Sequence, residues 1–298
     1  MTVEWREVAK DLGLTEGPVW TSRGTLAVKS MSRGLVYEID QAGVVQVLAE
    51  TGGGPNGLAE GPDGTLWVAQ NGGGHLATSS GRPVTPSIQR LCGGHAEDVI
   101  TEGLESPNDC VFAPDGRRCF TDPRGNPFEG EQVAGRVCSL DVDSLDLRAV
   151  VDGPLYPNRL AFEPDGVDFY LAETATRRVL HAHYANGAIG PLSIFAQLPD
   201  GEPDGLTTDA DGNVYVANAG GNSVYVFDRN GTLLRHHDVG NGQRVVATNL
   251  CFGGPVREML YLTVLKSGSV LACPRREVIL NADGHAGTIR VGRTEGPT

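Results

Sequence analysis

The segment TGGGPNGLAEGPDGTLWVAQNGGG, residues 51–74, is the most informative stretch of the chain about its fold. Its glycines at positions 52, 54 and 57 match the G-x-G-x-x-G pattern of dinucleotide-binding loops. Such a loop must open a helix, because the pyrophosphate lies at the helix N-terminus. Here the glycines lead instead to an Asp63-Gly64 turn and then TLWV, which is typical of strand, tight turn and strand. We therefore interpret these glycines as residues that let the chain turn sharply into a strand, and not as a nucleotide site.

The same pattern recurs along the chain. A polar residue is followed by a few mostly apolar residues, a turn that ends in glycine and a second strand, as in PNDCVFAPDG, PNRLAFEPDG and PDGLTTDADG. EGPVWTSRG and TNLCFGG are variants near the two ends. The leading residues are 40, 52, 50, 46 and 45 positions apart: Glu16, Asn56, Asn108, Asn158, Asp204 and Asn249. A period near 40–50 residues with several short strands per unit indicates a β-propeller.

These repeats predict an all-β protein, a single domain over residues 1–298 that forms a six-bladed β-propeller with a central metal-binding channel. The N-terminal segment VEWREVAKDLGL is expected to add an outer strand to the last blade and so close the ring. Closure would remove the exposed strand edges.

Composition excludes several classes of partner. The formal net charge is −13 and the pI is about 4.9, so nucleic acid and anionic membranes would repel the surface. No stretch approaches the ~20 apolar residues of a membrane span, and the N-terminus lacks the apolar region of a signal peptide. We expect a small-molecule substrate, and the sequence leaves the oligomeric state open.

The cysteines and histidines indicate no further site. None of the six cysteines forms a C-x-x-C motif and three lie in apolar runs, so we predict reduced cysteines and a cytoplasmic location. The seven histidines form no metal-like pair, and His181-x-His183 is expected on the surface of an outer strand. No G-x-S-x-G or similar nucleophile motif is present.

In a propeller the innermost strands line the channel, so the leading residues of the repeats should form a ring, called here the inner ring: Glu16, Asn56, Asn108, Asn158, Asp204 and Asn249. All its side chains offer oxygen, which suits Ca²⁺ best, Mg²⁺ or Mn²⁺ less well and Zn²⁺ least. Alternatively, such residues bond only their local backbone at turns. A shared register in six units, starting with a Glu that caps no helix, favours the metal site.

A second layer of polar residues is expected at the ends of the second strands, at Asp122, Glu173 and Asn218. Pro123 stops the strand after Asp122 and could direct its carboxylate inward; the alternative is a strand-end cap. Arg124 and Arg159 could bind a substrate carboxylate, although an Asp neighbour is favoured for both.

Together, EGPVW, PNGLAEGPDGTLWVA, SPNDCVFAPDG, FTDPRG, PNRLAFEPDG, PDGLTTDADG and TNLCFGG resemble the senescence-marker-protein/gluconolactonase/luciferin-regenerating-enzyme-like family. The motifs follow the family's order over nearly the whole chain. The resemblance implies a six-bladed propeller with a divalent cation, usually calcium, in its channel. Family members include gluconolactonases, drug-responsive bacterial lactonases and diisopropyl-fluorophosphatase-like phosphotriesterases.

By the same resemblance, Glu16, Asn158 and Asp204 match metal ligands, and Asn108 matches a further ligand or a substrate contact. Asp204 also matches the general base of lactonase-like members. Asp122 resembles a catalytic Asp of the drug-responsive lactonases.

Two positions depart from the family pattern. Lys29-Ser30 stands where the first blade often carries an Asp, and Arg159 stands where a Gly is usual. Both are expected to reshape the substrate pocket.

We therefore predict a metal-dependent lactonase, a gluconolactonase-like hydrolase that opens a lactone of a sugar acid or a related molecule. The cation, calcium or alternatively Mg²⁺, Mn²⁺ or Zn²⁺, would act as Lewis acid, with Asp204 or Asp122 as general base. The predicted substrate-binding residues are Asn56, Asn108, Asn249 and Arg124. Alternatives are a phosphotriester or ester hydrolase, a biosynthetic enzyme that reuses the channel, and a non-catalytic calcium- or ligand-binding propeller.

Overall fold

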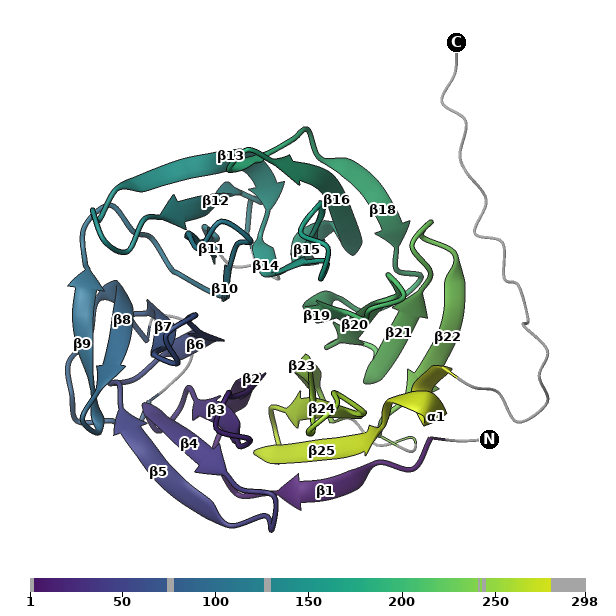
Figure 1. Ribbon diagram of the computed structural model, residues 1–298, viewed down its shortest axis with the longest axis horizontal. Coiled ribbons are helices and arrows are strands. Elements are labelled where there is room, and N and C mark those ends of the chain that lie inside the picture. Colours follow the sequence, from purple (N-terminus) through teal and green to yellow (C-terminus); the bar gives the residue numbers. More distant parts are fainter. Residues whose placement is uncertain (1–2, 74–77, 126–129, 241, 243–244, 280–298) are drawn as a thin grey trace.

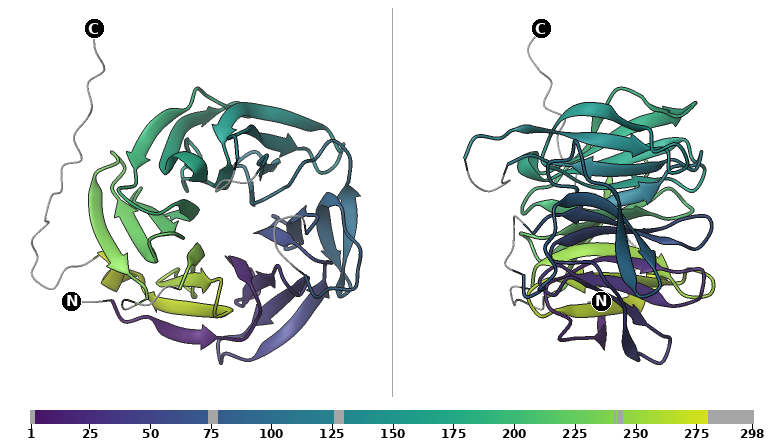
Figure 2. Two further views of the ribbon diagram at one scale, coloured as in Figure 1. Left: turned by 180° about the vertical axis from the view of Figure 1, so that it is seen from behind. Right: turned by 90° about the vertical axis from the view of Figure 1, so that its left-hand side faces the viewer.

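A computed structural model describes residues 3–73, 78–125, 130–240, 242 and 245–279. Its sheets surround a common axis, as in a β-propeller (Figure 1). Figure 2 shows the same ring of sheets from behind and from the side. The fold is therefore the all-β propeller that the repeats predict.

The first part of the chain forms an eight-stranded sheet of two antiparallel four-stranded groups. One group consists of β2 (Thr15–Trp20), β3 (Leu26–Ser30), β4 (Leu35–Ile39) and β5 (Val45–Glu50). The other consists of β6 (Pro55–Glu60), β7 (Leu66–Asn71), β8 (Pro86–Cys92) and β9 (His95–Ile100). The two groups are joined through one parallel pair, Glu50 and His95.

The middle of the chain forms two further sheets. The first contains β10 (Cys110–Phe112), β11 (Arg118–Asp122), β12 (Ala134–Leu140) and β13 (Leu147–Leu155). The second contains β14 (Pro157–Phe162), β15 (Asp168–Glu173), β16 (Arg178–Ala185), β17 (Ala188–Ile189) and β18 (Ser193–Gln197), with the 3₁₀ turn η1 (Thr174–Thr176) between β15 and β16. Here β16 pairs with both β17 and β18, so this sheet splits at its outer edge.

The last part of the chain forms two more sheets. One contains β19 (Pro203–Thr208), β20 (Val214–Asn218), β21 (Ser223–Phe227) and β22 (Leu233–Asp238). The other contains β23 (Ala247–Gly253), β24 (Met259–Val264) and β25 (Ser269–Pro274), followed by α1 (Arg275–Ile279). The N-terminal strand β1 (Arg6–Ala9) pairs antiparallel with β25 at the outer edge of this sheet. No helix in the described part of the chain is long and apolar enough to cross a membrane.

The described part of the glycine-rich segment, residues 51–73, folds as strand, turn and strand. β6 and β7 pair antiparallel across the Asp63-Gly64 turn, where Gly64 has a φ of 79°. Gly54 has a φ of 90°, and a Cβ there would lie 2.2 Å from Asn71 Oδ1. These glycines permit tight turns and close packing, and no helix comes after them as a dinucleotide site requires.

The core lies between successive strand groups. In the described residues, buried apolar side chains form six clusters, each of which joins two groups that are neighbours around the ring. One cluster, for example, packs Tyr215 and Val224 against Leu250 and Leu262. Burial of this kind holds the sheets side by side and so brings their innermost strands together.

Candidate functional site

The innermost strands bring the inner ring together. Figure 1 places β2, β6, β10, β14, β19 and β23 nearest the axis. Five ring residues lie near the start of these strands, and Asn108 lies just before β10. The pairing of β2, β6, β14, β19 and β23 with their partners is interrupted at the ring residue or beside it. Such bulges turn a side chain away from the regular pleat, here at the same place in each repeat.

Glu16 is held by a network of direct contacts. The Asn249 Nδ2 donates to Glu16 Oε2 at 3.1 Å, and the Gly17 backbone N–H donates to the same oxygen at 2.6 Å. Lys29, opposite Glu16 on β3, places its Nζ 3.6 Å from that oxygen. Burial raises the pKa of the Glu16 carboxyl, an effect that Lys29 opposes and Asp109 reinforces.

Asp109 is a third carboxylate at the centre, and the sequence interpretation did not include it. It is 1% exposed and accepts hydrogen bonds from Arg159 Nη1 at 2.7 Å and from Asn249 Nδ2 at 2.8 Å. Arg159 therefore pairs with an Asp neighbour, as favoured from sequence. The available signal was positional: Asp109 and Arg159 each directly follow a ring residue, in consecutive repeats.

Asp204 has a different environment from Glu16 and Asp109. It forms no ion pair with any described residue, although it is hydrogen-bonded to Asn158. Burial raises the pKa of its carboxyl well above the ordinary value, and the charges of Glu16 and Asp109 add to this effect. Asp204 is thus a carboxylate that lacks a cation at short distance.

The two remaining acceptors of the predicted metal set lie beside Asp204. The Asn158 Nδ2 donates to Thr174 Oγ1 at 3.2 Å, and Thr174 in turn donates to the Pro203 carbonyl at 2.8 Å. Asn108 is hydrogen-bonded to Tyr156, whose pKa burial raises to about 12, so that its hydroxyl stays protonated at neutral pH. Tyr156 was not predicted from sequence either.

The other two amide side chains of the inner ring, Asn249 and Asn56, differ in their burial and in their hydrogen bonds. Asn249 is 1% exposed; its Nδ2 donates to two carboxylates and its Oδ1 accepts the Leu250 N–H at 2.9 Å. This side chain is engaged in positioning Glu16 and Asp109. Asn56 is half-buried, and no hydrogen bond of its side chain is found among the described residues. Asn56 is therefore the amide better placed to meet a substrate.

Asp122 is built into the scaffold. It is completely buried, and its carboxylate accepts the Ser106 N–H at 2.7 Å and two Arg136 N–H groups, from Nη2 at 2.6 Å and Nε at 3.0 Å. The arrangement fixes the chain just before Asn108 and leaves the carboxylate fully engaged. The predicted role of Asp122 as a base has no support in this geometry, because a base needs a free lone pair near the substrate.

The other two residues of the predicted second layer, Glu173 and Asn218, are also hydrogen-bonded to neighbouring residues. Glu173 accepts the Leu155 N–H at 2.8 Å, and Asn218 donates to Asp200 Oδ1 at 2.8 Å. Both act as strand-end caps, the alternative weighed for Asp122. Arg124 is 42% exposed at its side chain and lies 3.7 Å from Glu105, and its contact with substrate stays a prediction.

The expectation that the histidines form no metal-like group needs correction. Asp168, His181 and His183, called here the Asp–His cluster, bring three ligand atoms within 4.8 Å of one another. The sequence showed that the two histidines share a face of one strand. It did not show Asp168, which lies opposite His183 on the neighbouring strand.

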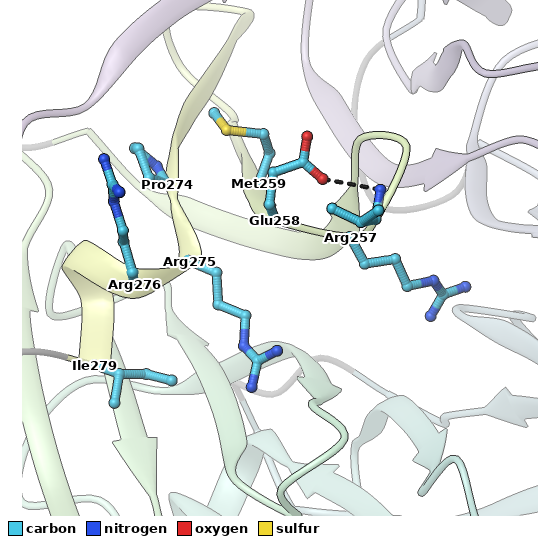
Figure 3. A pocket seen from close by; sticks show the side chains of 8 residues that line it. Arg257, Glu258, Met259, Pro274, Arg275, Arg276 and Ile279 are labelled. Atoms are coloured by element: carbon cyan, nitrogen blue, oxygen red, sulfur yellow. Dashed lines mark hydrogen bonds between the residues drawn. The ribbon is translucent and has the colours of Figure 1, made fainter.

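A separate surface pocket of about 680 Å³ is lined by residues between Val256 and Ile279, near the end of the described chain (Figure 3). It is formed by the turn between β23 and β24, the end of β25 and α1, and its lining includes Met259, Ile279 and Arg275. The Arg275 guanidinium already pairs with Asp209 at 3.0 Å and Asp211 at 2.7 Å. No predicted site residue lines this pocket.

All six cysteines are free, and four of them are buried, as predicted for reduced core cysteines. Burial raises the pKa of Cys251 and of Cys119 to about 12, so neither thiol is ionised at neutral pH. Neither of these two thiols is therefore suited to act as a nucleophile.

Comparison with known proteins finds relatives in both sequence and fold. The chain is 29% identical to a gluconolactonase of Zymomonas mobilis over 278 residues, which cover 83% of this chain and 75% of that protein. It is 34% identical to the pentonolactonase XacC of Haloferax volcanii over 152 residues, about half of each protein, 48% of this chain and 51% of the relative. The structure of a gluconolactonase from Xanthomonas campestris superimposes with a TM-score of 0.75 at 26% identity, covering 91% of this chain and 89% of that one.

A calcium-binding regucalcin from Agrobacterium tumefaciens has the same fold, with a TM-score of 0.75 at 19% identity over 91% of this chain and 94% of that one. The family model that describes the SMP-30/gluconolactonase/LRE-like region matches residues 14–266. The chain therefore belongs to the SMP-30/gluconolactonase/LRE-like family.

Proposed function

We propose that this protein is a divalent-cation-dependent hydrolase that opens the lactone ring of a sugar acid or a related small molecule, at the centre of a six-bladed propeller. The blade count takes the two halves of the eight-stranded sheet as separate blades. The sugar lactonases among its relatives support the substrate class.

The observation that carries the proposal is the environment of Asp204. Three carboxylates, Glu16, Asp109 and Asp204, face two cationic side chains, Lys29 and Arg159. The two cations lie against Glu16 and Asp109, which leaves Asp204 with a raised pKa and no cation within ion-pair distance in the described chain. A buried carboxylate in this state favours the binding of a cation.

The donor set fits a divalent cation. Glu16, Asp204, Asn158 and Asn108 all offer oxygen, the ligand type that calcium and magnesium prefer. The hydrogen bonds found for Asn158 use its Nδ2, so its Oδ1 remains to accept a cation. A bound divalent cation would supply Lewis-acid polarisation of the lactone carbonyl.

The chain's own residues supply the remaining steps. Asp204 accepts the proton of the attacking water and returns it to the ring oxygen, which leaves as a hydroxyl when the ester bond breaks. Asn56 and Asn108 orient the hydroxyls of the substrate, while Asn249 holds Glu16 in place. Asp122 maintains the loop that presents Asn108.

A panel of lactones tests the proposal: aldonolactones, alkyl γ- and δ-lactones and dihydrocoumarin, each with chelator and after return of Ca²⁺, Mg²⁺, Mn²⁺ or Zn²⁺. We expect turnover of a sugar lactone that chelator abolishes and one of these ions restores. If chelator left the turnover unchanged, the proposed dependence on a divalent cation would be wrong. Tight cation binding without turnover of any lactone would favour an ester hydrolase, a biosynthetic enzyme or a binding protein instead.

A further inference from the structure

The Asp–His cluster lies in the outer part of the sheet that contains β14–β18, where β16 pairs with β15 on one side. His181 and His183 are two residues apart on β16, so they lie on the same face of the sheet. Asp168 begins β15 and is the cross-strand partner of His183. The cluster therefore results from strand pairing and not from a flexible loop.

Both imidazoles approach one oxygen atom. The Nε2 of His181 lies 2.7 Å from Asp168 Oδ1, and the Nδ1 of His183 lies 2.9 Å from the same oxygen. Two bonds of about 2.0–2.1 Å at a tetrahedral angle place their donors roughly 3.3 Å apart. The distances to Asp168 would have to open by about 0.6 Å for His181 and by about 0.4 Å for His183, whose side chain is 74% exposed.

The surroundings of the cluster are strongly acidic. Glu163 and Asp165 form a second group with Asp168 whose ligand atoms also lie within 4.8 Å of one another. Glu163 is 6% exposed and accepts the Tyr170 hydroxyl at 2.9 Å. The local carboxylates would therefore favour a cation electrostatically, and Glu163 is already oriented by a hydrogen bond.

We propose that Asp168, His181 and His183 form a binding site for a borderline transition-metal ion such as Zn²⁺, separate from the inner ring. Two imidazole nitrogens with one carboxylate oxygen suit zinc, nickel, cobalt or copper and not calcium or magnesium. Three protein ligands leave one coordination position open to water.

The position of the site suggests what the ion does. At His181 the strand β16 still pairs with β18, and at Tyr184 it pairs with β17. An ion held by β15 and β16 clamps these two strands where the outer edge of the sheet splits. Binding to the folded state alone stabilises it by mass action.

Zinc titration of the untagged, metal-free protein tests the proposal. The Glu16→Gln/Asp204→Asn double variant removes two ring carboxylates, so that the remaining zinc binding reports on the Asp–His cluster. We expect one equivalent of Zn²⁺, and at least about tenfold weaker binding in the additional His183→Ala variant, because one of three ligands is lost. His95→Ala, another exposed strand histidine, is the matched control and should bind as the double variant does.

Zinc binding that His183→Ala leaves unchanged, or no stoichiometric binding, would overturn the proposal. If the double variant does not fold, imidazole NMR of the wild type replaces the titration. Zinc must then shift the signals of His181 and His183 and not that of His95. Zinc binding at the Asp–His cluster is measured without lactone turnover, so failure of the proposed lactonase function would leave this test unaffected.

Discussion

The inner ring and the Asp–His cluster are two places where ligand side chains converge, and they differ in almost every physical respect. The ring draws one residue from each of six repeats and offers oxygen as its ligand atom, and two buried basic side chains, Lys29 and Arg159, lie beside it. The cluster draws its ligands from one strand pair, offers two nitrogens and is partly exposed. Because the ring is buried, the balance of its charges controls whether a cation binds there. In the partly exposed cluster, the type of ligand atom controls which metal ion binds.

The largest expected effect concerns the base in the ring. Asp204→Asn should lower kcat/KM for a sugar lactone about 10²–10⁴-fold, because the amide cannot accept the proton of water. Steady-state kinetics with saturating cation measure this effect. Asp143→Asn, on an exposed turn, is the control and should remain as active as the wild type. Full activity of Asp204→Asn with the cation bound would show that another group is the base.

The next effect separates buried from exposed ion pairs. Arg159→Met leaves Asp109 buried beside Glu16 and should lower the free energy of unfolding by about 3 kcal/mol. Arg90→Met breaks the exposed pair with Glu97, where solvent screens the charges, and should lower the free energy of unfolding far less. Urea unfolding of both variants measures the difference. If both variants lost the same free energy of unfolding, the ion pair of Arg159 with the buried Asp109 would contribute no more than an exposed pair.

The pH dependence of stability should follow the ring carboxylates. Burial raises the pKa of Glu16 and of Asp204 in the folded state, so the folded chain holds these protons more tightly than the unfolded chain. This contribution is fully present below the unfolded pKa values and is lost as the pH rises through the folded ones. Metal-free protein should therefore lose stability above about pH 4, and Asp204→Asn should reduce the loss. A loss of the same size in Asp204→Asn would contradict the assignment.

A smaller effect concerns the cation that the chain itself provides. The Lys29 Nζ is completely buried 3.6 Å from Glu16 and has no hydrogen-bond partner among the described residues. Burial lowers the pKa of Lys29, an effect that Glu16 and Asp109 oppose. The ammonium should weaken a divalent cation bound at Glu16, so Lys29→Met should bind Ca²⁺ roughly tenfold more tightly. Isothermal titration measures the change.

Lys10→Met is the matched control, since Lys10 and Glu7 lie 3.7 Å apart on the exposed surface. Its calcium affinity should equal that of the wild type. Equal or weaker binding by Lys29→Met would show that the ammonium does not compete with the metal.

The smallest effect belongs to the Asp–His cluster. Zinc at ten times its dissociation constant should stabilise the Glu16→Gln/Asp204→Asn variant by about 1.4 kcal/mol, which corresponds to roughly 2–4 °C in Tm. Differential scanning calorimetry should find this increase absent after His181→Ala. An equal increase in both variants would place the zinc elsewhere.

Much of the fold could be predicted because its signals are local. The Asp63-Gly64 turn and the apolar residues around it specify strand, turn and strand without reference to distant segments. Repetition of the unit then predicts a propeller, since each unit must bury its apolar faces against the next. Register within the repeat also predicts which residues face the centre.

Several partners of these residues could not be predicted, because they come from other repeats or carry no motif. Arg159 reaches Asp109 over 50 positions, and Asn249 reaches Glu16 over 233. The role of Asp122 depends on Arg136 and on the backbone at Ser106, neither of which is marked by a motif. The Asp–His cluster likewise depends on the pairing of β15 with β16, which places Asp168 opposite His183.

The order of residues along the chain was enough to predict the repeat, the propeller, the family and the oxygen donors of the inner ring, because each depends on local chemistry repeated in one register. The charge balance among those donors emerged only in the folded chain. Lys29 lies against Glu16 and Arg159 against Asp109, and Asp204 has no cation within ion-pair distance among the described residues. A buried charge depends on whatever lies within a few ångströms of it, and packing between sheets chooses those neighbours.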